Sequence, residues 1–202
     1  MSQEIGDELL EILTTKLRVL SEAQIARTWG MDADSLRSLL ESLETDKLIN
    51  RISLLCHPEI ELSEPVLRWT PGDEEPDLGA IAYQLQSRWS EPSEAVSCVN
   101  ATVVARNRYG GYIGGRRPRV SETTHDLHLA QVFLRLRDRS RDEARAWISE
   151  HQQQAEGAKK SKLPDAILRL EQPRVIDFGG SYPKAKLQSF HEANRESSYE
   201  IW

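Results

Sequence analysis

Apolar residues recur every three or four positions through the first 45 residues, and this spacing predicts helices. The first helix is expected over residues 7–17 and the second over residues 22–29. Ser21 and Gln24 have the spacing of a capping box, and Gly30 is a typical C-terminal stop for the second helix. The chain is therefore expected to begin with a helical unit.

A third helix is expected after Asp32 or Asp34, either of which is a suitable N-cap. Residues 48–55 then form a strand-like run, Pro58 interrupts it, and residues 60–69 can return as a second strand. Three helices followed by a β-hairpin are the element order of a winged helix. The pattern predicts such a domain up to about residue 70.

The pattern changes in the second half of the chain. Residues 70–94 begin as an acidic linker with proline and glycine and continue as a helix near residues 77–89. Residues 95–105 are β-branched and apolar, which predicts a strand. We expect a winged-helix domain over residues 1–71, a linker and connecting helix over 72–94, and a second domain over 95–202.

The last part of the chain contains a second helix-and-hairpin signal. Thr123 or Thr124 is expected to cap the next element, whose apolar residues 127–134 fit either a helix or a strand. Residues 163–191 contain two short apolar runs with turn residues between them and a helical pattern after them. This stretch predicts a hairpin followed by a helix.

Charge divides the chain in two. Residues 1–100 hold 8 Lys and Arg against 19 Asp and Glu, a net charge of −11, and residues 101–202 hold 18 against 13, a net charge of +5. The basic half is the better candidate for contact with phosphates. The third helix exposes mainly acidic and serine side chains, so it favours contact with a protein partner or a second copy, as in a dimer, over base reading.

An arginine-rich segment follows the expected strand at residue 105. Its candidate DNA-binding residues are Arg106, Arg108, Arg116, Arg117, Arg119 and Tyr112. Arginine forks and tyrosine faces suit phosphate and base contacts, and the glycines between them allow close approach of the backbone to a ligand. The alternative is a solvated hairpin whose charges bind nothing. No Walker or dinucleotide-binding fingerprint is present in the sequence.

Two carboxylates mark the expected hairpin. Asp165 precedes its first apolar run, Asp177 ends the second, and Lys186 lies on the following helix. Paired carboxylates with a lysine are what a divalent metal and a phosphodiester require, although Asp is also common in turns and at strand ends. His125 is expected to have a structural role at a helix start, and no zinc or nucleophile motif is present in the sequence.

Short motifs along the chain resemble the replication-relaxation family of plasmid and mobile-element proteins. They are His125, Trp147 with Glu150, Pro164-Asp165-Ala166, Asp177 with Gly179, and Lys186-Leu187 before Phe190. The resemblance implies a winged helix joined to a domain similar to the PD-(D/E)xK restriction-endonuclease fold, an α/β (α+β) domain with a mixed sheet. It also implies a possible Mg²⁺ site made of Asp165, Asp177 and Glu150, with Lys186 stabilising developing phosphate charge.

The sequence departs from an active nuclease at two positions. Val175 stands where the family pattern has Glu, and Gly179 stands where an active PD-(D/E)xK enzyme has its lysine. The leading expectation is therefore a DNA-binding protein of a plasmid or mobile element that acts in replication, mobilisation or its control without cleavage. The alternatives are a Mg²⁺-dependent endonuclease and a non-enzymatic assembly subunit.

Cysteines and hydropathy bear on the location of the protein. Cys56 and Cys98 form no metal or redox spacing and suit a reducing compartment. No apolar run approaches the roughly 18 residues of a membrane helix, and the acidic N-terminus is not a signal peptide. We expect a cytoplasmic protein without a membrane partner.

Overall fold

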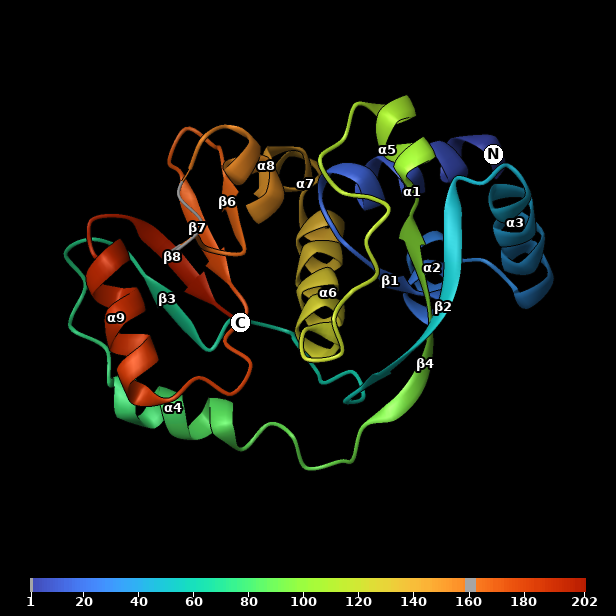
Figure 1. Ribbon diagram of the computed structural model, residues 1–202. Helices are drawn as coiled ribbons and strands as arrows, with labels where there is room; N and C mark the ends of the chain where they lie inside the picture. The colour runs from blue at the N-terminus through green and yellow to red at the C-terminus, as the bar shows by residue number, and fades with distance from the viewer. Residues whose placement is uncertain (1, 159–162) are drawn as a thin grey trace.

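The computed structural model describes residues 2–158 and 163–202, and over these residues the chain forms nine helices and two β-sheets. The two sheets lie on either side of α6 (Thr123–Arg139), as Figure 1 shows. The mixed α/β class expected from the sequence is confirmed.

Three helices open the chain as expected. They are α1 (Ser2–Thr15), α2 (Glu22–Trp29) and α3 (Ala33–Thr45). Ser21 and Gln24 form the predicted capping box, and Gly30 ends α2 in the left-handed conformation with φ 61°. Asp32 rather than Asp34 caps α3, because its Oδ1 accepts a hydrogen bond from the Ser35 N–H at 2.8 Å.

The first sheet is antiparallel, in the order β1-β4-β2, from β1 (Leu20–Ser21), β4 (Glu94–Ala101) and β2 (Ile49–Cys56). The expected hairpin between residues 48–55 and 60–69 is wrong, because β2 pairs along its whole length with β4. Only β3 (Leu67–Trp69) forms in the second of those segments, and it pairs with β8 (Ser198–Ile201) in the other sheet. Alternating apolar residues specify which face of a strand is buried, but they do not specify its partner.

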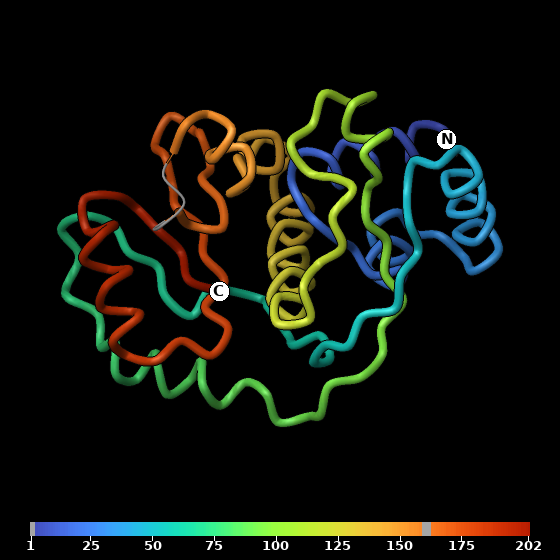
Figure 2. Tube along the Cα trace, viewed as in Figure 1, coloured from blue at the N-terminus to red at the C-terminus, as the bar shows by residue number. Residues whose placement is uncertain are grey.

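The strand pairing therefore does not follow the boundary expected near residue 71. After β2 the chain enters the second sheet through β3, passes through α4 (Leu78–Gln86), and returns to the first sheet as β4. The tube in Figure 2 shows this excursion around the lower edge of the molecule.

The second sheet has five strands in the order β3-β8-β7-β6-β5. An antiparallel meander of β5 (Trp147–Ser149), β6 (Ala166–Leu168) and β7 (Arg174–Asp177) is followed by α9 (Lys184–Asn194) and by β8, which is parallel to β7. The hairpin and helix predicted over residues 163–191 are confirmed. Helices α4 and α9 cover one face, where Leu85 and Leu187 pack with Tyr199.

A helix replaces the end of the strand expected over residues 95–105. The Thr102 hydroxyl accepts a hydrogen bond from the Ala105 N–H at 3.2 Å and so caps α5 (Val103–Tyr109), and Gly110 ends this helix with φ 66°. The cap and the C-terminal glycine outweigh the β-preference of the two valines that begin the helix.

The segment after α5 is fastened to α1. The N–H groups of Tyr112 and Ile113 both donate to the carbonyl of Thr14, each at 2.8 Å. A Cβ on Gly111 would overlap that same carbonyl, and a Cβ on Gly115 would overlap Val103. These glycines therefore allow close approach to the protein's own backbone and side chains rather than to a ligand.

Helix α6 begins differently from the prediction. Glu122 is its N-cap residue and makes no side-chain capping bond. Thr123 does not cap the helix, because its hydroxyl is directed to the carbonyls of Leu55 and Val120. Two short helices, α7 (Arg141–Ala146) and α8 (Glu150–Ala155), flank β5. Within the described ranges, no helix has the length and apolar character needed to cross a membrane.

Candidate functional site

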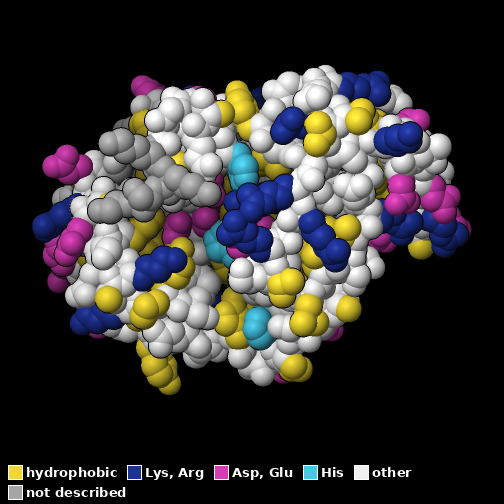
Figure 3. Space-filling view, viewed as in Figure 1, with side chains coloured by type: hydrophobic (Ala, Val, Ile, Leu, Met, Phe, Trp, Pro, Cys, Tyr) yellow, Lys and Arg dark blue, Asp and Glu magenta, His cyan; other side chains and the backbone are white. Residues whose placement is uncertain are grey.

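A cavity of about 360 Å³ lies at the N-terminal end of α6, between the two sheets. Its walls come from the loop after α1, the first turns of α6 and α8, the residue before β6, and the start of α9. In Figure 3, Lys and Arg side chains gather over the centre of this face, with His beside them and acidic side chains deeper in the hollow. The cavity therefore combines both signs of charge.

Asp165 and Asp177 are brought together as the sequence suggested. Ala166 pairs with Ile176 in the β6-β7 register, so Asp165 and Asp177 lie opposite one another at the end of the two strands. The Asp165 N–H donates to Asp177 Oδ1 at 3.4 Å. The hairpin thus places two carboxylates side by side, with Asp165 lining the cavity and Asp177 buried behind it.

His125 holds Asp165 from the first turn of α6. Its Nε2 lies 3.0 Å from Asp165 Oδ2, and its Nδ1 lies 3.4 Å from Asp126 Oδ1. Burial opposes the charge of His125, but Asp165 and Asp126 raise its pKa well above the usual value. Burial likewise opposes the charge of Asp165, while His125 and the Phe178 N–H lower its pKa. Each partner therefore favours the charged form of the other.

The pKa of Asp177 is shifted in the opposite direction to that of Asp165. Burial first, and then the neighbouring Asp165 carboxylate, raise the pKa of Asp177 well above its usual value. The Tyr182 hydroxyl donates to Asp177, and the Lys186 ammonium lies 3.4 Å from the centre of the Tyr182 ring. Burial lowers the pKa of Lys186, which the two aspartates oppose. Lys186 therefore lies against Tyr182 and near enough to both hairpin carboxylates to interact with their charges.

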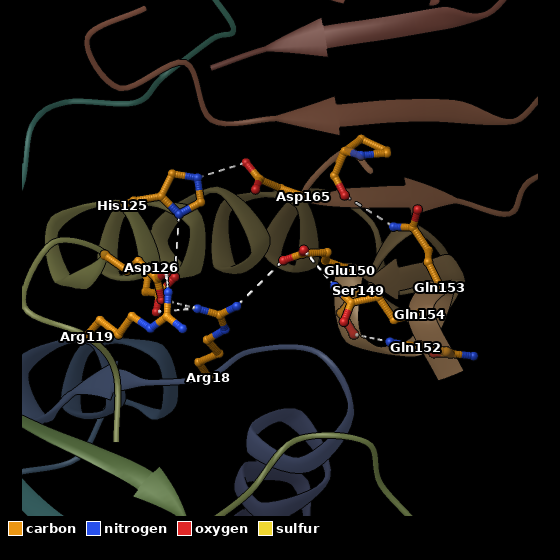
Figure 4. A network of polar contacts seen from close by, with 12 residues as sticks. Arg18, Arg119, His125, Asp126, Ser149, Glu150, Gln152, Gln153, Gln154 and Asp165 are labelled. Atoms are coloured by element: carbon orange, nitrogen blue, oxygen red, sulfur yellow. Dashed lines mark hydrogen bonds and ion pairs between the residues drawn. The ribbon is translucent and has the colours of Figure 1, made fainter. Parts of the chain in front are cut away.

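Arg18 is the central cation of the cavity, and sequence reasoning missed it. Its guanidinium nitrogens lie 2.7 Å from Glu122, 3.5 Å from Asp126 and 3.6 Å from Glu150. Figure 4 shows Arg18 between Glu150 and Asp126, with His125 and Asp165 on the far side. Glu122 and Asp126 lie one turn apart at the start of α6, but Arg18 and Glu150 come from distant parts of the chain, so no local spacing indicates this arrangement.

The metal ligands implied by the resemblance do not fit a Mg²⁺ ion in this arrangement. Asp165 Oδ2 already accepts hydrogen bonds from His125 and Phe178, and the raised pKa of Asp177 favours its protonated form. Glu150 faces Arg18 and accepts a hydrogen bond from Gln154 at 2.7 Å. Across residues 2–158 and 163–202, no three His, Cys, Asp or Glu side chains are grouped so that they could hold a metal ion.

The predicted DNA-binding arginines lie on one surface segment, α5 and the turn after it, which we call the arginine loop (residues 103–120). Arg117 donates to the Ser53 carbonyl at 3.0 Å, and Arg119 lies 3.5 Å from Glu122 at the cavity. Arg106 contacts Asn107, and Arg108 lies 6.0 Å from the Tyr109 ring centre. Of these side chains, Arg119 reaches the cavity through Glu122, and Arg116, Arg119 and Tyr112 are all exposed.

Comparisons with protein-family models, with curated proteins and with solved structures found no match. The assignment of a function therefore depends on the geometry of the chain itself.

Proposed function

We propose that this chain binds DNA through the arginine loop and does not cut it. The observation that carries the proposal is that four of the five loop arginines lack a carboxylate partner among the described residues, the exception being Arg119, which pairs with Glu122. In the part of the chain that the structure describes, Arg106, Arg108, Arg116 and Arg117 make no ion pair with a carboxylate. Outside the loop, only Arg88 and Arg135 among the described arginines share this property.

Unpaired arginines on a surface are suited to phosphates. A guanidinium that already contacts a carboxylate must lose that contact before it can bind another anion. Arg106, Arg108, Arg116 and Arg117 need no such exchange, and the loop backbone is held to α1 through the Thr14 carbonyl. Cations held close together on a fixed segment attract the phosphate backbone strongly at low salt.

The arrangement of elements supports the resemblance found in the sequence. Three helices with an antiparallel sheet support a winged helix whose wing strands, β2 and β4, are separated by a long insertion. A meander, a helix and a parallel strand support a PD-(D/E)xK-like second unit. These likenesses favour a role in replication, mobilisation or its control, as an analogy of fold.

The surface of α3 favours a protein contact. Asp34, Glu41 and Glu44 are exposed on it, and Arg37 is paired with Asp34 at 3.1 Å. Phosphates repel such a surface, so a groove-reading role for α3 is disfavoured. We propose that α3 contacts a protein partner or a second copy of this chain, while the arginine loop contacts DNA.

The test is a change of Arg116, Arg117 and Arg119 to Ala, with DNA affinity measured by fluorescence anisotropy over a range of salt. Each lost phosphate contact lowers the slope of log affinity against log salt by about 0.7 to 0.9. We expect at least about a tenfold loss of affinity at low salt and a shallower slope, for single-stranded and duplex probes alike.

The matched control changes Arg37, Arg145 and Arg169 to Ala. These three arginines are exposed and lie outside the loop, and each is paired with a carboxylate. The control loses the same net charge, so it separates the loop from a general charge effect. Unchanged DNA affinity in the loop variant, or an equal loss in both variants, would exclude the loop as the DNA-binding surface.

A further inference from the structure

Exposed apolar side chains gather on the arginine loop. Of the large hydrophobic side chains that are exposed among the described residues, four lie in residues 103–120: Val103, Val104, Tyr112 and Val120. Their exposed fractions run from 40% for Tyr112 to 78% for Val120. Exposed hydrophobic side chains are therefore interspersed among the arginines of this segment.

A fifth exposed apolar residue lies next to the end of the loop. The Thr123 hydroxyl donates to the carbonyls of both Val120 and Leu55, at 3.0 and 2.6 Å, which brings the end of β2 beside the loop. The Leu55 side chain is 56% exposed. Figure 3 shows hydrophobic side chains between Lys and Arg side chains on the half of this face that carries α5 and the first sheet.

Phosphate contacts do not explain these apolar side chains. A valine or leucine gains free energy only when an apolar surface covers it, by roughly 25 cal/mol per Å² removed from water. The faces of nucleobases are such surfaces, and they are accessible in a single strand but stacked on one another in a duplex. Proteins that bind single strands combine cations along the backbone with side chains on which bases rest.

The other possible duplex contact is weak in this chain. The helix in the position of a recognition helix is α3, and its exposed face carries Asp34, Glu41 and Glu44. Negative charge there opposes docking of a duplex in which the arginine loop and α3 both approach phosphates. A single strand can follow the loop alone.

We infer that the arginine loop binds single-stranded DNA, with its arginines on the phosphates and its apolar side chains on the unpaired bases. This inference rests on the proposed DNA-binding function and adds the form of DNA that the loop prefers. Tyr112 is the residue that stacks on a base, and Val103, Val104 and Val120 cover neighbouring base faces or sugars.

The test compares three fluorescein-labelled probes by anisotropy at one ionic strength. They are an oligothymidine of about 20 nucleotides, longer than a single binding site, a duplex of the same length, and an abasic strand with the same number of phosphates. We expect the oligothymidine to bind at least about tenfold more tightly than the other two, because stacking of one base is worth about tenfold or more.

Variants locate the contact. Tyr112→Ala and the double change Val103→Thr, Val104→Thr are expected to weaken oligothymidine binding, by about tenfold for Tyr112→Ala, and to weaken duplex binding by a much smaller factor. The threonines keep the branched shape of the valines, and thermal melting confirms that each variant is folded. Tyr83→Ala is the matched control, because Tyr83 is 79% exposed on α4, away from the loop.

The outcomes separate the inference from the proposed function. Equal binding of all three probes, with Tyr112→Ala unchanged, would overturn the single-strand inference and leave DNA binding by charge intact. Tighter binding of the duplex would also overturn it. Failure of every DNA probe to bind would overturn both ideas and leave an acidic protein segment as the occupant of the surface.

Discussion

The arginine loop and the cavity beside it both concentrate charge, and they differ in what each charge already contacts. Arg116 and Arg117 in the loop have no carboxylate partner among the described residues, whereas Arg18 in the cavity has three. His125 and Asp165 in the cavity form a hydrogen-bonded pair with each other. Most charges of the loop are therefore available to a ligand, whereas Arg119 and the charges of the cavity pair within the fold.

This difference changes which residues carry the proposed function. The hairpin carboxylates Asp165 and Asp177 attract attention first, because their spacing matches catalytic chemistry. The structure places them together, but both already accept hydrogen bonds from the protein, and the Asp165 carboxylate disfavours the charge of Asp177. Availability of a charged group therefore depends on neighbours that are distant in the sequence, and charge spacing alone does not reveal it.

The largest expected effect is on stability, when a cation is removed from the cavity rather than from the arginine loop. Arg18→Ala leaves three carboxylates without their shared partner, so we expect it to lower the free energy of unfolding by about 2 kcal/mol. That is less than for a fully buried pair, because Arg18 is 29% exposed. Arg116→Ala should change stability by less than about 0.5 kcal/mol. Urea unfolding measures both, and equal losses would contradict the comparison.

Replacing either hairpin carboxylate is expected to change the melting temperature by a smaller amount, and the two replacements should act in opposite directions. The raised pKa of Asp177 means that the unfolded chain releases this proton above about pH 4 while the folded chain retains it. Ionisation of Asp177 therefore opposes folding increasingly as pH rises toward the folded pKa. Asp177→Asn should raise the melting temperature at neutral pH by a few degrees, with each unit of pKa shift worth about 1.4 kcal/mol.

Asp165→Asn is the matched control for this change. The lowered pKa of Asp165 means that its carboxylate adds stability above about pH 4, which is lost as pH falls through the folded pKa. Asp165→Asn should therefore lower the melting temperature at neutral pH, and both differences should shrink near pH 3.5, where each wild-type carboxyl is largely protonated when unfolded. The same sign for both variants at neutral pH would show that the two carboxyls do not differ as described.

The smallest expected effect is on the integrity of DNA. Supercoiled plasmid incubated with the protein and Mg²⁺ or Mn²⁺ should stay intact, because the hairpin carboxylates do not fit a divalent ion in their present arrangement. Gel electrophoresis detects a single nick per plasmid. Cleavage that disappears in Asp165→Ala and Asp177→Ala would show that these residues form a metal site when DNA is bound, and would establish the nuclease alternative.

Local features of the fold were predictable from the sequence, and pairings between distant segments were not. The Ser21 capping box, the Gly30 stop and the hairpin over residues 163–177 each depend on residues close together in the chain. The pairing of β2 with β4 depends on an insertion that carries its own strand, and no pattern of alternation indicates which strand is the partner. The valines that begin α5 predicted a strand, but Thr102, which precedes them, caps a helix instead.

The candidate site divides in the same way. The arginines of the loop and the hairpin aspartates are visible as motifs, because each set is local in the sequence. Arg18 is not, since a single arginine after a helix resembles any surface cation. The partners of Arg18 on α6 and α8 reach it only through the packing of both sheets around α6.

The excursion of the chain between β2 and β4 has a consequence for folding on the ribosome. Leu67 in β3 pairs with Ile201 in β8, so β3 emerges long before its partner is synthesised. Until then its apolar residues Leu67 and Trp69 have no sheet to join, and an unpaired strand is prone to aggregate. The first sheet can close around the excursion once β4 emerges, with the second sheet still incomplete. Pairing over such long sequence separations slows folding, so the insertion that joins the two sheets also delays their completion.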